Sequence, residues 1–195
     1  MNLFMKPISL DDIRGIAAYE KIRGEFRQKI IDLKKKRRVG VGDKVSLVFE
    51  NRDTVIFQIQ EMMRAEKITD LDKIREEIEV YNGLIPGPGE LSATLFLEIE
   101  DQGHLRDDLL KFLGVDEAVF LKVGSCEIQA HFEEGRSKED KISAVQYVKF
   151  PLSAEARAAL AGPATATLSI EHPNYRAQAR LGAETRESLL ADLEE

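Results

Sequence analysis

Apolar residues recur at helical spacing through the first part of the chain. Phe26, Ile30 and Leu33 lie at i, i+4 and i+7, which places them on one face of a helix. Gly24 precedes this stripe, and we expect it to interrupt the helical segment. Residues 10–38 are therefore predicted to be mainly helical.

A second helical segment is predicted over residues 52–84. Asn51 is a common N-cap residue, and it predicts a helix from 52 to about 66. Thr69 with Asp72 has the spacing of a capping box, which predicts the start of a further helix.

The period of the pattern changes at Pro86. From there on apolar residues such as Ala93 and Leu95 alternate with polar ones, which is typical of strands. Two alternating runs on either side of a turn at residues 173–174 predict a hairpin. Residues 91–181 are thus expected to contribute most of an antiparallel sheet.

Helices first and antiparallel strands later predict the α+β class. We expect N-terminal helices packed on a mainly antiparallel β-sheet, with further short helices. The length fits a single domain over residues 1–195. Within it we expect a helical N-terminal part to about residue 85 and a sheet-rich part from about 90 to 195.

The composition excludes several kinds of site. The sequence holds one cysteine, Cys126, and three histidines, and no spacing directs two of these ligands to one ion. We therefore expect no metal and no cofactor. Cys126 shares strand parity with Ile128 and is expected to be a small buried residue. His131 is expected on a solvated polar strand face.

Other classes of function are excluded by missing motifs. The sequence has no glycine-rich nucleotide-binding motif and no nucleophile elbow. Its first residues lack the apolar run of a signal peptide, and no stretch approaches the ~20 apolar residues that span a bilayer. We expect a cytoplasmic protein without membrane contact.

Charge is distributed unevenly, although the net charge is -7. Residues 1–44 carry 12 Lys or Arg against 6 Asp or Glu. The basic run 34–38 is typical of the solvated C-terminus of a helix, where cations interact favourably with the helix dipole. Nucleic-acid binding through residues 34–38 is an alternative, but the acidic net charge disfavours it. We therefore expect no nucleic-acid partner.

The densest polar run lies at the start of the second helical segment. It combines carboxylates, amides, two arginines and a phenylalanine. An aromatic side chain among these groups indicates a covered face, because burial of its apolar area is favourable. The candidate ligand- or partner-binding residues are Glu50, Asn51, Arg52, Asp53, Phe57, Gln60, Glu61 and Arg64.

Two interpretations of this cluster stay open. It can form a pocket floor or a partner groove, in which Arg64 offers a two-point contact to a carboxylate or phosphate. It can also be a structural network that joins helix to sheet. Asp53 and Arg64 lie about three turns apart. We expect both in one connected polar network at a cleft or interface.

Four longer motifs stand out in the first half of the chain. They are residues 6–13 (KPISLDDI), 47–54 (LVFENRDT), 57–62 (FQIQEM) and 86–94 (PGPGELSAT). Together they resemble a bacterial family known only as a domain of unknown function, over nearly the whole chain from Met5. Members of that family tend to be encoded near rubrerythrin-like proteins and Cys-rich iron–sulfur oxidoreductases. The resemblance therefore implies a redox protein of this kind as a partner, and a role in oxidative stress.

The residues themselves limit that role. A rubrerythrin-like di-iron site needs Glu-x-x-His pairs, and here Arg64 follows Glu61 at that spacing. Any electron carriers are then expected in the partners. Our leading hypothesis is a non-catalytic accessory or ligand-binding protein linked to oxidative-stress or redox systems. The alternative is an enzyme, with catalytic residues unknown, that uses the Glu/Asp/Arg cluster of residues 50–64 on a small anionic substrate.

Overall fold

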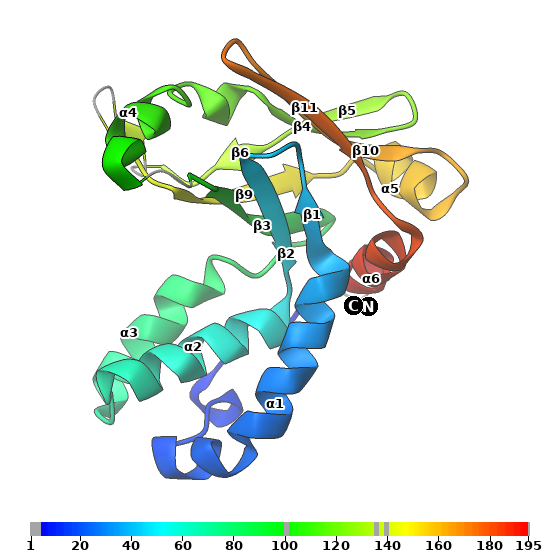
Figure 1. Cartoon of the computed structure of the whole chain (residues 1–195). Coiled ribbons are helices and arrows are strands. Elements are labelled where there is room, and N and C mark those ends of the chain that lie inside the picture. The colour runs from blue at the N-terminus through cyan, green and yellow to red at the C-terminus, as the bar shows by residue number, and fades with distance from the viewer. Residues whose placement is uncertain (1–4, 100–101, 135–136, 139–140, 195) are drawn as a thin grey trace.

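A computed structural model of the chain describes residues 5–99, 102–134, 137–138 and 141–194 and has an α+β fold (Figure 1). The predicted fold class is confirmed. Helices of the N-terminal part form an arm below two antiparallel sheets in Figure 1. Its elements are a 3-10 turn (Leu10–Asp12), α1 (Ile16–Arg37), α2 (Arg52–Glu66) and α3 (Leu71–Asn82).

The helix boundaries follow local capping, with two corrections to the sequence predictions. Asn51 caps α2 as expected, and its side chain accepts a hydrogen bond from the Thr54 N–H at 3.1 Å. The cap of α3 is Asp70 and not Thr69. Gly24 does not interrupt α1, which runs unbroken through it. A glycine inside a helix costs only about 1 kcal/mol relative to alanine, so packing of the helix outweighs it.

The first sheet has five strands in the order β1-β2-β3-β9-β6, and each neighbouring pair is antiparallel. The six residues of β2 are all buried, because both faces of this strand are covered. The strands are β1 (Arg38–Gly40), β2 (Val45–Glu50), β3 (Glu90–Leu97), β9 (Val145–Pro151) and β6 (His131–Phe132).

The second sheet has the order β11-β10-β4-β5 and contains the predicted hairpin. Its strands are β4 (Val119–Val123), β5 (Cys126–Gln129), β10 (Ala166–His172) and β11 (Tyr175–Arg180). A two-stranded ribbon joins β7 (Ser137–Lys138) and β8 (Lys141–Ile142). The remaining elements are 3-10 turns at Gln102–His104 and Val115–Glu117, and the helices α4 (Leu105–Leu110), α5 (Ala154–Ala161) and α6 (Ala183–Glu194).

Two apolar clusters hold these layers together. The larger one takes in both sheets and includes Leu47, Leu95 and Leu121. The smaller one lies between α2, α3 and the N-terminal segment, with Ile59 and Ile78 among its members. The single-domain organisation over residues 1–195 stays a prediction.

Arg37 joins the helical arm to α6 at the end of α1. Its side chain is 1% exposed and forms an ion pair with Asp192. It also donates to the Phe49 carbonyl at 2.9 Å, the Glu50 carbonyl at 3.2 Å and the Ser188 hydroxyl at 2.8 Å. The expectation of a wholly solvated run at residues 34–38 is therefore wrong at this residue.

Among the described residues, no helix is both long and apolar enough to cross a bilayer.

Candidate functional site

Four of the eight predicted site residues, Asp53, Phe57, Glu61 and Arg64, line the contact between α2 and α1. Phe57 is half-buried, and its ring meets the Phe26 ring edge-on, with centroids 5.8 Å apart. The expected cover over Phe57 is thus a helix of the same chain. This contact contributes hydrophobic stabilisation to the helical arm.

Glu61 is the centre of a polar cluster in this contact. Its carboxylate accepts hydrogen bonds from Arg23 Nε at 2.8 Å, from Arg23 Nη2 at 2.9 Å and from the Tyr19 hydroxyl at 2.8 Å. The Arg23 guanidinium and the Tyr19 hydroxyl lower the pKa of Glu61 against the opposing effect of burial. Burial, followed by the hydrogen bond to Glu61, raises the pKa of Tyr19.

Asp53 and Arg64 lie in two separate ion pairs on the same helix face. Asp53 pairs with Lys29 at 2.7 Å, and Arg64 pairs with Glu20 at 2.5 Å. The prediction that one connected network contains both residues is therefore wrong in the described part of the chain. The reason is that α1 runs along this face and supplies a different partner at each end.

Arg52 and Gln60 bind the N-terminal segment. Arg52 donates from Nε to the Lys6 carbonyl at 2.9 Å and pairs through Nη2 with Asp12 at 2.6 Å. Gln60 is buried, and its amide makes two hydrogen bonds with the backbone of Arg14, at 2.7 and 2.9 Å. These two side chains hold the segment before α1 against α2.

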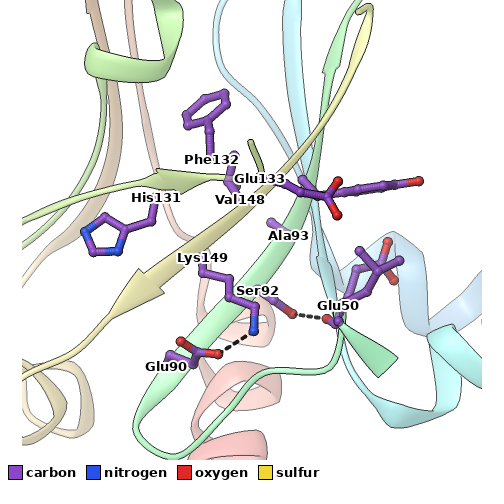
Figure 2. A pocket seen from close by; sticks show the side chains of 12 residues that line it. Glu50, Glu90, Ser92, Ala93, His131, Phe132, Glu133, Val148 and Lys149 are labelled. Carbon is purple, nitrogen blue, oxygen red and sulfur yellow. Dashed lines mark hydrogen bonds and ion pairs between the residues drawn. The ribbon is translucent and has the colours of Figure 1, made fainter. Parts of the chain in front are cut away.

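Glu50 is the predicted residue that reaches a cavity. The cavity has a volume of about 250 Å³ and opens between the chain segment after α3 and strands β3, β9 and β6 (Figure 2). Its apolar walls come from aliphatic and aromatic side chains. The lining residues are Glu50, Gly83, Leu84, Glu90, Ser92, Ala93, His131, Phe132, Glu133, Tyr147, Val148 and Lys149.

A polar row crosses four strands at this cavity. Glu50 of β2 pairs in register with Ser92 of β3, Ser92 pairs with Lys149 of β9, and Lys149 pairs with His131 of β6. Directly opposed residues share one face of a sheet. At a strand spacing of about 4.8 Å, the row extends over roughly 14 Å. It therefore lines the cavity with a carboxylate, a hydroxyl, an ammonium and an imidazole in that order.

The Glu50 side chain is held in place by two hydroxyl groups. The residue is only 3% exposed. Its Oε1 accepts from the Thr94 hydroxyl at 2.7 Å, and its Oε2 accepts from the Thr54 hydroxyl of α2. Because Thr54 lies in the first turn of α2, the Asn51 cap that starts this helix also orients the carboxylate.

Lys149 and Glu90 point toward each other at the cavity (Figure 2). Lys149 Nζ donates to Glu90 Oε1 at 2.8 Å, and the Gly87 N–H donates to the same oxygen at 2.7 Å. The turn at Pro86–Gly89 therefore uses the Gly87 N–H to hold the Glu90 carboxylate.

The two remaining polar residues of the row, Ser92 and His131, differ in their burial and hydrogen bonding. Ser92 is buried and donates its hydroxyl proton to the Leu84 carbonyl at 2.6 Å. His131 is exposed at the edge of the cavity, in agreement with the solvated strand face expected for it. Cys126 lies away from this cavity and is half-buried against the apolar core.

The sequence predictions missed Ser92, Glu90 and Lys149. A signal for two of them was present in the alternation of Glu90, Ser92 and Thr94, which puts three polar residues on one face of a strand. Lys149 had no local signal, since its place depends on the pairing of β3 with β9.

The described residues contain no group of three or more His, Cys, Asp or Glu side chains arranged to hold a metal ion. The polar row has one carboxylate and one imidazole at opposite ends. This set of donors suits an organic ligand better than a metal ion.

Comparisons with known proteins extend over the whole fold. Residues 7–193 match the model of a family described as a protein of unknown function, DUF3501. The chain is also similar to a crystal structure of a novel protein of unknown function from Burkholderia pseudomallei K96243. That likeness has a TM-score of 0.90 and 32% sequence identity, over 96% of this chain and 100% of the other. A comparison with curated proteins gives no match.

Proposed function

We propose a function for this chain, which belongs to the DUF3501 family of proteins of unknown function, from the cavity at its centre. The protein is a non-catalytic binding protein, and its ligand is a small organic molecule held in the cavity beside Glu50. The observation that carries this proposal is the polar row of Glu50, Ser92, Lys149 and His131, which four neighbouring strands bring to one cavity.

The shape and lining of the cavity support a small ligand. Binding sites for small molecules are concave, largely apolar and carry a few placed polar groups. The cavity volume of about 250 Å³ lies just below the roughly 300–1,000 Å³ of most small-molecule pockets, so the ligand is small. Leu84 and Tyr147 can contact the apolar body of such a ligand, while the row binds its polar groups.

An acid–base enzyme is the second candidate, and the same row favours it. A carboxylate, a hydroxyl, an amine and an imidazole are the usual groups of such sites. The hydrogen bonds that these groups already make within the protein favour a binding function over catalysis. The Ser92 hydroxyl donates to a backbone carbonyl, and the Lys149 amine donates to Glu90. A nucleophile and its base would need to be hydrogen-bonded to each other.

The anionic substrate expected for residues 50–64 has less support. The two arginines of that cluster are Arg52 and Arg64, and they pair with Asp12 and Glu20. Neither lines the cavity.

The link to redox systems forms the second part of the proposal and rests on the family resemblance. We propose that the protein is a cytoplasmic accessory of a rubrerythrin-like or iron–sulfur partner and carries no electrons itself. Its single cysteine supports this role, because one thiolate cannot hold an iron–sulfur cluster. Co-elution of the full chain with a purified rubrerythrin-like protein tests it, and separate elution at high concentration would contradict it.

A fragment screen by protein-observed NMR tests the binding function. The full chain, labelled with ¹⁵N, is titrated with small fragments that have one polar group. We expect fragments to shift the backbone signals of Ser92, Tyr147 and Val148 together, because these residues belong to two adjacent strands of the cavity.

A blocking variant provides the control. His131→Trp places a large ring at the exposed edge of the cavity and should abolish these shifts. Gln129→Trp puts the same ring on an exposed position of β5, outside the cavity, and should leave the shifts unchanged. Fragments that bind only elsewhere, or that bind His131→Trp equally well, would overturn the proposal.

A further inference from the structure

We infer that the ligand carries a cationic nitrogen, an ammonium or guanidinium group, that pairs with the Glu50 carboxylate. This inference rests on the proposed binding function and names the chemical class of the ligand. It follows from how Glu50 is buried and from which groups surround it.

Glu50 is a buried carboxylate that lacks a cationic partner among the described residues. Its side-chain hydrogen bonds come from two neutral hydroxyls, those of Thr54 and Thr94. Removing a carboxylate from water is costly unless an opposite charge and hydrogen bonds compensate for it. Glu50 lines the cavity, so a positive group bound there can pair with its carboxylate.

The other carboxylates nearby show what this site lacks. Glu90 lines the same cavity and is paired with Lys149 at 2.8 Å. Asp192 has a side chain that is 5% exposed, and it is paired with Arg37. In both cases the chain supplies its own cation, whereas for Glu50 the cavity leaves room for one.

Arg37 does not take this role, although it lies close to Glu50. Its donors go to the backbone carbonyls of Phe49 and Glu50, to Ser188 and to Asp192. The guanidinium therefore binds the backbone of Glu50 and leaves the carboxylate to its two hydroxyl partners. A carboxylate has about four lone-pair sites, so Glu50 can accept further donors from a ligand.

The walls of the cavity favour an organic cation over a hydrated metal ion. Leu84 and Tyr147 offer apolar contacts that a hydration shell cannot use, and Tyr147 lies on the face of the polar row because it pairs in register with Thr94. The aromatic ring of Tyr147 can also contact a cation through its face. The described residues supply no set of metal ligands.

Three probes of matched shape test the inference on the full chain. Benzylamine is a primary ammonium ion near neutral pH, benzyl alcohol is its uncharged counterpart, and benzoate carries the opposite charge. We expect benzylamine to shift the backbone signals of Ser92 and Val148, and to bind at least roughly tenfold more tightly than the other two. A charge-assisted hydrogen bond of about 1.5–3 kcal/mol predicts a difference of this size.

Two variants test the role of the Glu50 carboxylate in binding. Glu50→Gln keeps the size of the side chain and removes its charge, so it should weaken benzylamine binding roughly tenfold or more and leave benzyl alcohol unaffected. Glu79→Gln makes the same change on the exposed side of α3 and should have no effect. If Glu50→Gln does not fold, the charge preference of the unaltered chain is sufficient to decide.

The outcomes separate this inference from the proposed function. Benzyl alcohol or benzoate binding in the cavity without benzylamine would overturn the cationic ligand and leave the binding function in place. Equal benzylamine binding by Glu50→Gln would also overturn it. If fragments of every charge class fail to bind the cavity, the binding function itself fails.

Discussion

The Arg23 guanidinium meets the Glu61 carboxylate in a two-point ion pair, with Nε to Oε1 at 2.8 Å and Nη2 to Oε2 at 2.9 Å. The pair joins α1 to α2, and the Tyr19 hydroxyl donates to the same carboxylate. Two parallel N–H donors fix both position and orientation. This contact therefore sets how the first two long helices lie against each other.

The stabilising effect of Glu61 should depend on pH. Its pKa in the folded protein lies below the ordinary value of 4.5, mainly because of Arg23. A lowered pKa means that the stability is present above the unfolded-state value and is lost as the pH falls through the folded-state value. We expect Glu61→Gln to lower the melting temperature at neutral pH, and to lower it less at about pH 3.

Thermal melts of both proteins at the two pH values check this prediction. Glu79→Gln is the control, because Glu79 is exposed on α3. A loss of melting temperature in Glu61→Gln that is the same at both pH values would contradict the ion pair as its cause.

Gln60 should be a main source of stability for the N-terminal segment. Replacement by alanine removes two hydrogen bonds to the Arg14 backbone and leaves a small cavity. At about 1 kcal/mol for each bond, we expect Gln60→Ala to lower the free energy of unfolding by about 2 kcal/mol. Urea unfolding measures this change.

A conservative variant separates the two bonds of Gln60. In Gln60→Glu the side chain can still accept from the Arg14 N–H but cannot donate to its carbonyl when ionised. The variant should therefore be destabilised while the Arg14 amide keeps its protection from hydrogen exchange. Rapid exchange of that amide in Gln60→Glu would contradict the prediction.

Removal of the Asp192 carboxylate should be costly. Asp192→Ala leaves the buried Arg37 guanidinium without its ion-pair partner. Breaking a buried pair from one side costs about 3–5 kcal/mol. We expect a loss of this size in urea unfolding, and little change in the control Glu187→Ala, which alters an exposed carboxylate of α6. A loss below about 1 kcal/mol would contradict a structural role for the pair.

Gln58 offers a route to higher stability. Its Nε2 is the buried side-chain nitrogen or oxygen without a hydrogen-bond partner among the described residues. A buried unsatisfied polar group costs about 1–3 kcal/mol. We expect Gln58→Met to raise the free energy of unfolding by about 1 kcal/mol. Gln28→Met, at an exposed position of α1, should change it little, and a destabilised Gln58→Met would contradict the prediction.

The elements that local signals determine were predictable from the sequence. Asn51 marks the start of α2 because capping depends on residues only a few positions apart. The change of period at Pro86 marks the start of β3 and the later strands for the same reason, whereas β1 and β2 lie before it. Gly24 misled the prediction because its local cost is smaller than the packing that α1 gains as one long helix.

The candidate site was predictable only in part, because it depends on contacts between distant segments. Glu50 was found because it belongs to a dense local polar run. Its neighbours in the row follow from strand register, which joins residues 42 positions apart for Ser92 and more for Lys149 and His131. Strand register is set by long-range packing, which the spacing of residues along one segment does not reveal.

During synthesis the ribosome makes Arg37 155 residues before Asp192. At about 5–20 residues per second, the guanidinium exists for on the order of ten seconds or more before its carboxylate partner does. Over that time the end of β2, where Arg37 binds the carbonyls of Phe49 and Glu50, has no α6 to complete it. A nascent chain halted before residue 188 therefore lacks both the Ser188 and the Asp192 partners of the Arg37 guanidinium.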